Sequence, residues 1–132
     1  MATKVLDAYA LMAFFEDEPG ADLVRGLLQK AADNGTNLLM SVVNLGEVWY
    51  SIAHTTSPEI ADQYVGEIKG LGVEIIDVDW TLTRQAAAFK SNGNMSYADC
   101  FAAALAKARK ADLVTGDKEF KPLEGEIRIS WL

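Results

Sequence analysis

The stretch SYADCFAAALAKARKADLVTGD, residues 96–117, predicts a helix that runs directly into a buried strand. Ser96 is a typical helix N-cap, and the alanine-rich run that ends near Lys110 suits a helix lying close to a sheet. Residues 111–117 then form a short apolar run that ends at an acidic residue, as expected for a strand. A helix followed at once by a buried strand is typical of an α/β fold.

The same alternation continues along the rest of the chain. The expected strands cover residues 3–6, 38–43, 72–78, 111–117 and 126–131, and the expected helices cover residues 8–15, 21–34, 44–54, 59–69, 80–90 and 97–110. Alternating strands and helices favour right-handed crossovers and a parallel sheet. We therefore expect one domain, residues 1–132, with a three-layer α/β/α fold and a mostly parallel sheet of four to five strands.

Composition narrows the class of protein. Half of the 132 residues are hydrophobic, but no apolar run reaches the roughly 20 residues of a membrane-spanning helix. Asp7 interrupts the apolar N-terminal stretch, so we expect no signal peptide. The single cysteine, Cys100, excludes an intrachain disulfide. A soluble, cytoplasmic protein fits these features best.

The charge distribution bears on nucleic-acid binding. A net charge of -7 argues against a broad basic surface that holds nucleic acid, because phosphate contacts need lysine and arginine. The C-terminal third nevertheless concentrates positive charge, most of it expected on solvated helix faces. Lys118 follows Asp117 closely enough to touch a phosphate bound there. The residues of this basic group are Lys107, Arg109, Lys110, Lys118 and Lys121.

Four acidic residues are expected at one edge of the sheet. Asp7 directly follows the first strand, and Asp117 follows the fourth. Glu47 and Asp99 are expected in the first turns of helices whose N-termini lie at the same edge. Open α/β sheets bind ligands at this carboxyl edge of their strands. We therefore expect the four carboxylates to lie close together.

Helix capping is the competing interpretation of each acid. Asn44 with Glu47, and Ser96 with Asp99, have the spacing of capping boxes, and the other two acids could cap helices directly. Capping does not explain why all four are carboxylates, because two charges about 5 Å apart repel by roughly 3 kcal/mol at a dielectric of 20. Mg²⁺ or Mn²⁺ would relieve this repulsion, since both ions bind carboxylates together with substrate phosphates. The cluster therefore predicts metal-assisted phosphoryl transfer to water.

Four blocks resemble, in order and spacing, the conserved blocks of PIN-domain ribonucleases, and look most like those of VapC-type toxins. The resemblance runs from residue 3 to about residue 121. It implies an endoribonuclease that depends on Mg²⁺, with Mn²⁺ as a substitute, forms a homodimer and is inhibited by a small antitoxin. It also implies that Asp7, Glu47, Asp99 and Asp117 bind the metal and act in catalysis, with Thr115 as the hydroxyl of a Thr-x-Asp motif. The four blocks are VLDAYALMAFF, SVVNLGEVWY, MSYADCFAAALA and LVTGDKEF.

Two positions depart from this resemblance, and two further acids remain candidates for the site. Tyr9 stands where VapC-like proteins often have serine and is expected to narrow substrate access, and Gly116 stands where alanine or another small residue is common. Asp77 and Asp79 flank the end of the third expected strand, so they reach the same edge and are the best spare metal ligands. For Asp79, helix capping is the alternative.

Two other functions fit parts of the pattern. A catalytically inactive PIN-fold module that binds RNA or another protein would keep the fold and lack a ligand, whereas all four acids are present. A phosphatase with an aspartyl nucleophile would use Asp7 for attack and a second aspartate two residues later as the acid. That second position is Tyr9, which argues against a phosphatase.

Overall fold

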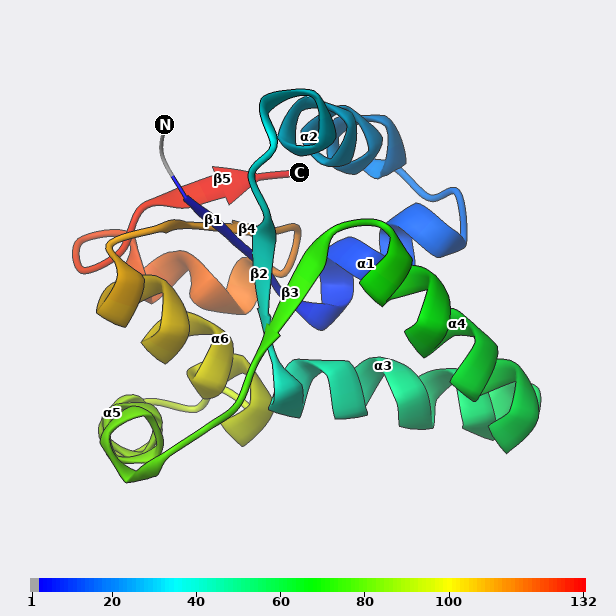
Figure 1. Ribbon diagram of the computed structural model, residues 1–132. Helices are drawn as coiled ribbons and strands as arrows, with labels where there is room; N and C mark the ends of the chain where they lie inside the picture. The colour runs from blue at the N-terminus through cyan, green and yellow to red at the C-terminus, as the bar shows by residue number, and fades with distance from the viewer. Residues whose placement is uncertain (1–2) are drawn as a thin grey trace.

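The computed structural model describes residues 3–132 and has a five-stranded sheet at its centre (Figure 1). The strands are β1 (Lys4–Leu6), β2 (Leu38–Ser41), β3 (Val73–Ile76), β4 (Asp112–Thr115) and β5 (Ile129–Trp131). Their order in the sheet is β3-β2-β1-β4-β5, and every neighbouring pair is parallel. The expected α/β fold with a parallel sheet is confirmed.

Helices cover both faces of this sheet. The α-helices are α1 (Ala8–Phe15), α2 (Ala21–Asn34), α3 (Val42–Thr55), α4 (Pro58–Gly70), α5 (Trp80–Ser91) and α6 (Tyr97–Arg109), and a 3₁₀ helix, η1, spans Lys118–Leu123. One hydrophobic core joins the sheet to α5, α6 and η1, and a second joins it to α1, α2, α3 and α4. Among residues 3–132, no helix is long and apolar enough to cross a membrane.

The two cores follow from the alternation of side chains along each strand. In β1, Val5 packs into the core of α5 and α6, and its neighbour Leu6 packs into the opposite core. In β4, Leu113 packs into the core of α5 and α6, and Val114 packs into the opposite core. Helix α6 is buried from Asp99 to Ala106, and the alanines within that stretch have almost no exposed surface. This confirms the expectation that small side chains let α6 lie against the sheet.

Several expected boundaries were wrong and one short helix was missed, and the end of β2 and the missed helix both affect the site. Strand β2 ends at Ser41 rather than residue 43, because the Ser41 Oγ accepts a hydrogen bond of 3.1 Å from the Val43 N–H and starts α3. Glu47 consequently lies in the second turn of α3, and Asn44 is not its N-cap. The short helix η1 was not expected at all, and the fifth strand starts at Ile129 rather than residue 126.

Candidate metal centre

Asp7 is the most deeply buried acid of the candidate site. It follows β1 and caps α1, with Oδ1 accepting a hydrogen bond of 2.9 Å from the Ala10 N–H. Its Oδ2 accepts a hydrogen bond of 2.5 Å from the Thr115 hydroxyl. Only 1% of Asp7 is exposed, and this burial raises the pKa of its carboxyl to about 7 although both hydrogen bonds lower it.

The contact between Asp7 and Thr115 follows from the register of two parallel strands. Leu6 of β1 pairs with Val114 of β4, so the residues that follow them come side by side. The Thr115 Oγ1 also accepts a hydrogen bond of 3.0 Å from the Asp117 N–H. A single buried hydroxyl therefore connects two of the candidate metal ligands.

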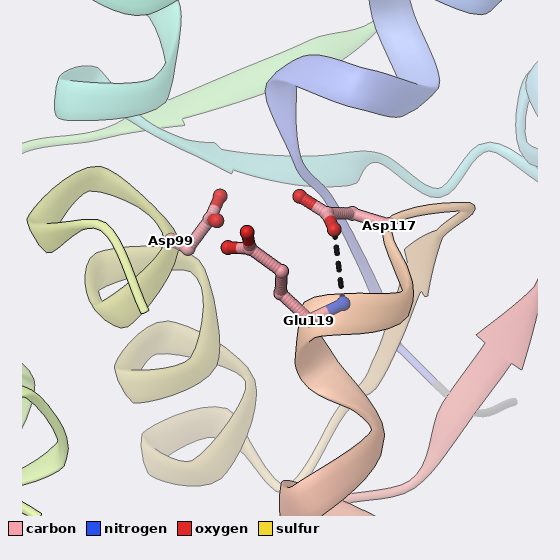
Figure 2. A group of neighbouring side chains, drawn as sticks. All are labelled: Asp99, Asp117 and Glu119. Atoms are coloured by element: carbon pink, nitrogen blue, oxygen red, sulfur yellow. Dashed lines mark hydrogen bonds between the residues drawn. The ribbon is translucent and has the colours of Figure 1, made fainter. Parts of the chain in front are cut away.

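Asp117 forms a tight carboxylate group with two other acids. It caps η1 by accepting a hydrogen bond of 3.0 Å from the Glu119 N–H. One oxygen each from Asp99, Asp117 and Glu119 lie within 4.8 Å of one another. Figure 2 shows the three side chains pointing toward a common space, Asp99 from α6 and the other two from the start of η1. Such a group can share one cation.

Glu119 was missed in the sequence. It lies two residues after Asp117, and only the tight turn of η1 brings its side chain back toward Asp99. The signal was a second acid two residues after the Thr-x-Asp motif, followed by a buried aromatic residue, Phe120. Because η1 was not expected, the spacing of Asp117 and Glu119 did not indicate that both side chains lie in one site.

Asp99 lies in the first turn of α6 and faces the exposed Glu119. The Ser96 Oγ caps the helix by accepting a hydrogen bond of 3.2 Å from the Asp99 N–H, and 8% of Asp99 is exposed. The pKa of Asp99 is raised to about 6, first by burial and then by the charges of Asp117, Glu47 and Glu119, although the hydrogen bond with Ser96 lowers it. The charge of Asp99 therefore interacts with acids from two other segments of the chain, α3 and the start of η1.

Glu47 reaches the site from the second turn of α3 and is half-buried. The Asn44 side chain donates one hydrogen bond to Oε1 of Glu47 (3.4 Å) and another to the Ala98 carbonyl (3.0 Å). Asn44 therefore ties α3 to the start of α6. The pKa of Glu47 is raised first by burial and also by the charge of Asp117, while the Asn44 hydrogen bond lowers it.

The four expected acids interact electrostatically, but their carboxylates are not equally close together. Asp99 and Asp117 belong to the tight group, whereas Asp7 and Glu47 belong to no group of that tightness among residues 3–132. The charges of Asp99 and Asp117 nevertheless raise the pKa of Asp7. Capping and clustering also coexist, because the cap hydrogen bonds of Asp7 and Asp117 each use one oxygen of the carboxylate.

The donor set fits a hard divalent cation. All the converging side chains offer carboxylate oxygens, which Mg²⁺ and Mn²⁺ prefer. Beside Glu47, the Asn44 Oδ1 is buried and has no hydrogen-bond partner among the residues described. The raised pKa values of Asp7, Glu47 and Asp99 indicate that the metal-free site resists full ionisation. A cation would relieve this cost.

The comparison with protein families decides the classification. The model of the PIN domain matches residues 4–126. This chain belongs to the PIN-domain family. No curated protein matches it significantly.

Solved structures with similar folds are VapC toxins in several bacteria. VapBC2 from Rickettsia felis, bound to a fragment of its promoter DNA, superposes with a TM-score of 0.75 at 21% identity, covering 98% of this PIN domain and 99% of that chain. VapC20 from Mycobacterium tuberculosis, a toxin that cleaves the sarcin–ricin loop, gives 0.71 at 14% identity, covering 91% and 94%. DNA-bound VapBC from Salmonella typhimurium gives 0.68 at 20% identity, covering 98% of each chain. The PIN fold is therefore shared along nearly the whole chain.

The two spare acids, Asp77 and Asp79, do not lie in the carboxylate cluster of this PIN domain. Asp79 caps α5 by accepting a hydrogen bond of 2.9 Å from the Leu82 N–H, as its capping alternative predicted. Asp77 and Asp79 line a pocket together with Lys107 and Arg109 in the last turn of α6. Asp99 lies in the first turn of the same helix, so the spare acids lie at its opposite end. Both acids follow β3, which is an edge strand, and from there the chain continues into α5.

The two positions that depart from the resemblance to VapC-type toxins, Tyr9 and Gly116, lie against each other in this PIN domain. A Cβ atom at position 116 would lie 2.7 Å from Cζ of Tyr9 and still closer to Cε1, so the tyrosine ring occupies the space of a side chain there. Tyr9 is 43% exposed. Glycine is the residue that lets the ring lie against the backbone between Thr115 and Asp117. The ring is thus placed beside the cluster, where the sequence led us to expect narrower access.

Proposed function

We propose that this PIN domain is a metal-dependent endoribonuclease that hydrolyses RNA phosphodiester bonds. The observation that carries the proposal is the convergence of carboxylate oxygens from Asp99, Asp117 and Glu119 at the carboxyl edge of the sheet. Asp7 and Glu47 complete the set, because their pKa values respond to the charges of that group. A site made only of carboxylates suits Mg²⁺, with Mn²⁺ as a substitute.

Each acid has a role that its surroundings support. Asp99, Asp117 and Glu119 would hold the cation directly. Asp7, which is almost wholly buried, and Glu47, which comes from α3, would be further ligands. Thr115 is fully buried and both of its hydrogen bonds go to residues of the site, so we assign it to positioning Asp7 and Asp117. When bound, the metal supplies an activated water and neutralises the scissile phosphate. The exposed Lys118 can approach a phosphate held at Asp117.

A proton-linked step accompanies metal binding in this scheme. Asp7 has a pKa of about 7 and Asp99 a pKa of about 6, so each holds a proton for part of the time near neutral pH. Metal ligands must be deprotonated, and loading the site therefore releases protons. Activity should rise from pH 6 to pH 8 for this reason.

The phosphatase alternative is disfavoured by the environment of Asp7. Both of its oxygens accept hydrogen bonds and it is almost wholly buried, whereas a nucleophile must approach the phosphorus atom. The inactive-module alternative requires a lost ligand, and all four expected acids are present, with Glu119 in addition.

We further propose that the protein is the toxin of a toxin–antitoxin pair and acts in the cytoplasm as a homodimer. Support comes from the structures of similar fold, several of which are complexes of VapB with VapC. Two large aromatic side chains, Tyr50 on α3 and Trp80 on α5, are more than half exposed, as expected of contact surfaces. Light scattering of the purified protein tests the dimer. Co-purification with the product of the adjacent gene tests the antitoxin.

RNA cleavage tests the proposed enzyme directly. Purified protein should cleave a fluorescently labelled RNA with 5 mM Mg²⁺ or Mn²⁺ but not with excess EDTA, and Asp99→Asn should lower the rate at least on the order of 100-fold. Asp77→Asn is the matched control, because Asp77 is an exposed acid at the far end of α6. Equal cleavage by the Asp99→Asn and Asp77→Asn proteins would refute the assignment.

A further inference from the structure

A groove of about 920 Å³ lies beside the carboxylate cluster. One wall is formed by the second half of α5 and the loop that follows it, and the other by η1. Glu119 belongs to both the cluster and the groove lining, so the two are continuous. The volume is at the upper end of the range for ligand pockets, which suits an occupant larger than one small molecule.

The groove gathers positive charge in a chain that is otherwise acidic. Lys118 and Lys121 line it and are exposed, and neither makes an ion pair with another residue of the described chain. Lys107 also lines it, with its Nζ 3.4 Å from Glu126 and 5.6 Å from the centre of the Phe89 ring. Glu119 and Glu126 line the groove as well, so its three lysines and two glutamates leave a net charge of +1. Three of the chain's twelve basic residues thus face one groove next to a metal-binding cluster. That arrangement suits a polyanion whose scissile phosphate lies at the cluster.

The remaining lining suits nucleobases rather than phosphate alone. The amide side chains of Gln85, Asn92 and Asn94 offer both donors and acceptors, as base edges require. Apolar surface comes from Phe89, Met95 and Pro122. A duplex hides its base edges, whereas a single strand can present both bases and phosphates to such walls.

We propose that this groove binds a segment of single-stranded RNA on one side of the scissile phosphate, with Lys107 and Lys121 contacting phosphates and the amide side chains contacting bases. The inference rests on the proposed ribonuclease function and adds the path of the substrate. It also gives a role to part of the basic group in the C-terminal third of the chain. The lysines act on substrate affinity, and the acids act on the chemical step.

Binding can be measured without cleavage. Fluorescence anisotropy of a labelled 12-nucleotide single-stranded RNA would be recorded with 5 mM Mg²⁺ in an Asp99→Asn background. Each phosphate contact is worth a factor of about four at 0.15 M salt for a single strand, so Lys107→Gln/Lys121→Gln should weaken binding on the order of ten-fold and flatten its salt dependence. Lys69→Gln, an exposed lysine on α4, is the matched control. Asn94→Ala tests the base contacts without altering any charge.

Cleavage kinetics separate this inference from the proposed function. In the otherwise native protein, the double lysine variant should raise KM for the 12-mer about ten-fold and leave kcat within two-fold. Hydrolysis of bis(p-nitrophenyl) phosphate, which is too small to fill the groove, should stay unchanged. If the double variant and Lys69→Gln bind RNA equally well while the native protein still cleaves it, the groove assignment is wrong and the ribonuclease stands. If the native protein neither binds nor cleaves RNA, the proposed function fails and the groove assignment fails with it.

Discussion

The hydroxyl of Thr115 donates a hydrogen bond of 2.5 Å to Oδ2 of Asp7, and this contact joins the ends of two parallel strands inside the candidate site. The same oxygen of Thr115 accepts the N–H of Asp117. One side chain without exposed surface therefore sets the positions of two acids.

Replacing Thr115 by valine should destabilise the fold and raise the pKa of Asp7 above about 7, because the lost hydrogen bond lowers that pKa. The variant leaves a buried carboxylate oxygen and the Asp117 N–H without this partner, at a cost of about 2 kcal/mol. Urea unfolding measures the stability, and carboxyl ¹³C NMR follows the titration. Thr115→Ser keeps the hydroxyl and is the control. Identical titration of Asp7 in both variants would show that the hydroxyl does not tune it.

Metal-free protein should be less stable at pH 8 than at pH 5. Asp7 has an ordinary pKa of 3.8 and a pKa of about 7 in the folded state, so the folded protein binds more protons between these values. Its stability therefore falls as pH rises from about 4, and the penalty is complete above pH 7. Each pH unit between the two pKa values is worth about 1.4 kcal/mol, so the Asp7 contribution approaches about 4 kcal/mol.

The variant Asp7→Asn isolates this contribution. It removes the titrating group, so unfolding in EDTA should depend less on pH, and the free energy of unfolding at pH 8 should exceed that of the native protein. Asp77→Asn, at an exposed position outside the cluster, should keep the native pH dependence. Greater stability of the native metal-free protein at pH 8 than at pH 5 would contradict the assigned pKa shifts.

Mn²⁺ should stabilise the folded protein, because the proposed site would bind it in the assembled cluster, which relieves repulsion between the carboxylates. At a concentration of 100 times Kd the gain is about 2.7 kcal/mol, which corresponds to a rise in Tm on the order of 10 °C. The rise should be smaller at pH 5, where the acids must first lose protons. Differential scanning fluorimetry measures it. A Tm that millimolar Mn²⁺ leaves unchanged, or raises equally in Asp99→Asn, would count against a shared site.

Gly116→Ala should destabilise the protein by about 1 kcal/mol, because the new methyl group must displace the Tyr9 ring. In a Tyr9→Ala background the same substitution should cost much less. A double-mutant cycle in urea gives the coupling energy between the two positions. Additive effects would show that the ring does not restrict residue 116 in solution.

The carboxylate cluster was largely predictable because strand direction fixes where a strand ends. Asp7 and Asp117 come just after buried parallel strands, and Asp99 opens the helix that leads into one of them. Their common edge therefore follows from topology alone. The contact of Asp7 with Thr115 depends in addition on strand register, which apolar patterns of three or four residues do not specify.

The errors arose where tertiary packing or a local side-chain cap decides the path of the chain. Asp77 and Asp79 follow β3, but the chain then leaves this edge strand toward α5, which lies against α6. That direction is set by the packing of α5 and has no local signal. Glu119 reaches the cluster through the turn that the Asp117 side chain caps, and such short 3₁₀ segments lack a clear hydrophobic period.

We propose that these carboxylates would hold a metal that supplies activated water for attack on an RNA phosphodiester, with the 3′-oxygen as leaving group. The ends of the cleavage products test it most directly. Mass spectrometry of an oligonucleotide cleaved with Mg²⁺ should show a 3′-hydroxyl on one fragment and a 5′-phosphate on the other, with no cleavage in EDTA. Fragments that end in a 2′,3′-cyclic phosphate, or products formed equally without metal, would contradict the account.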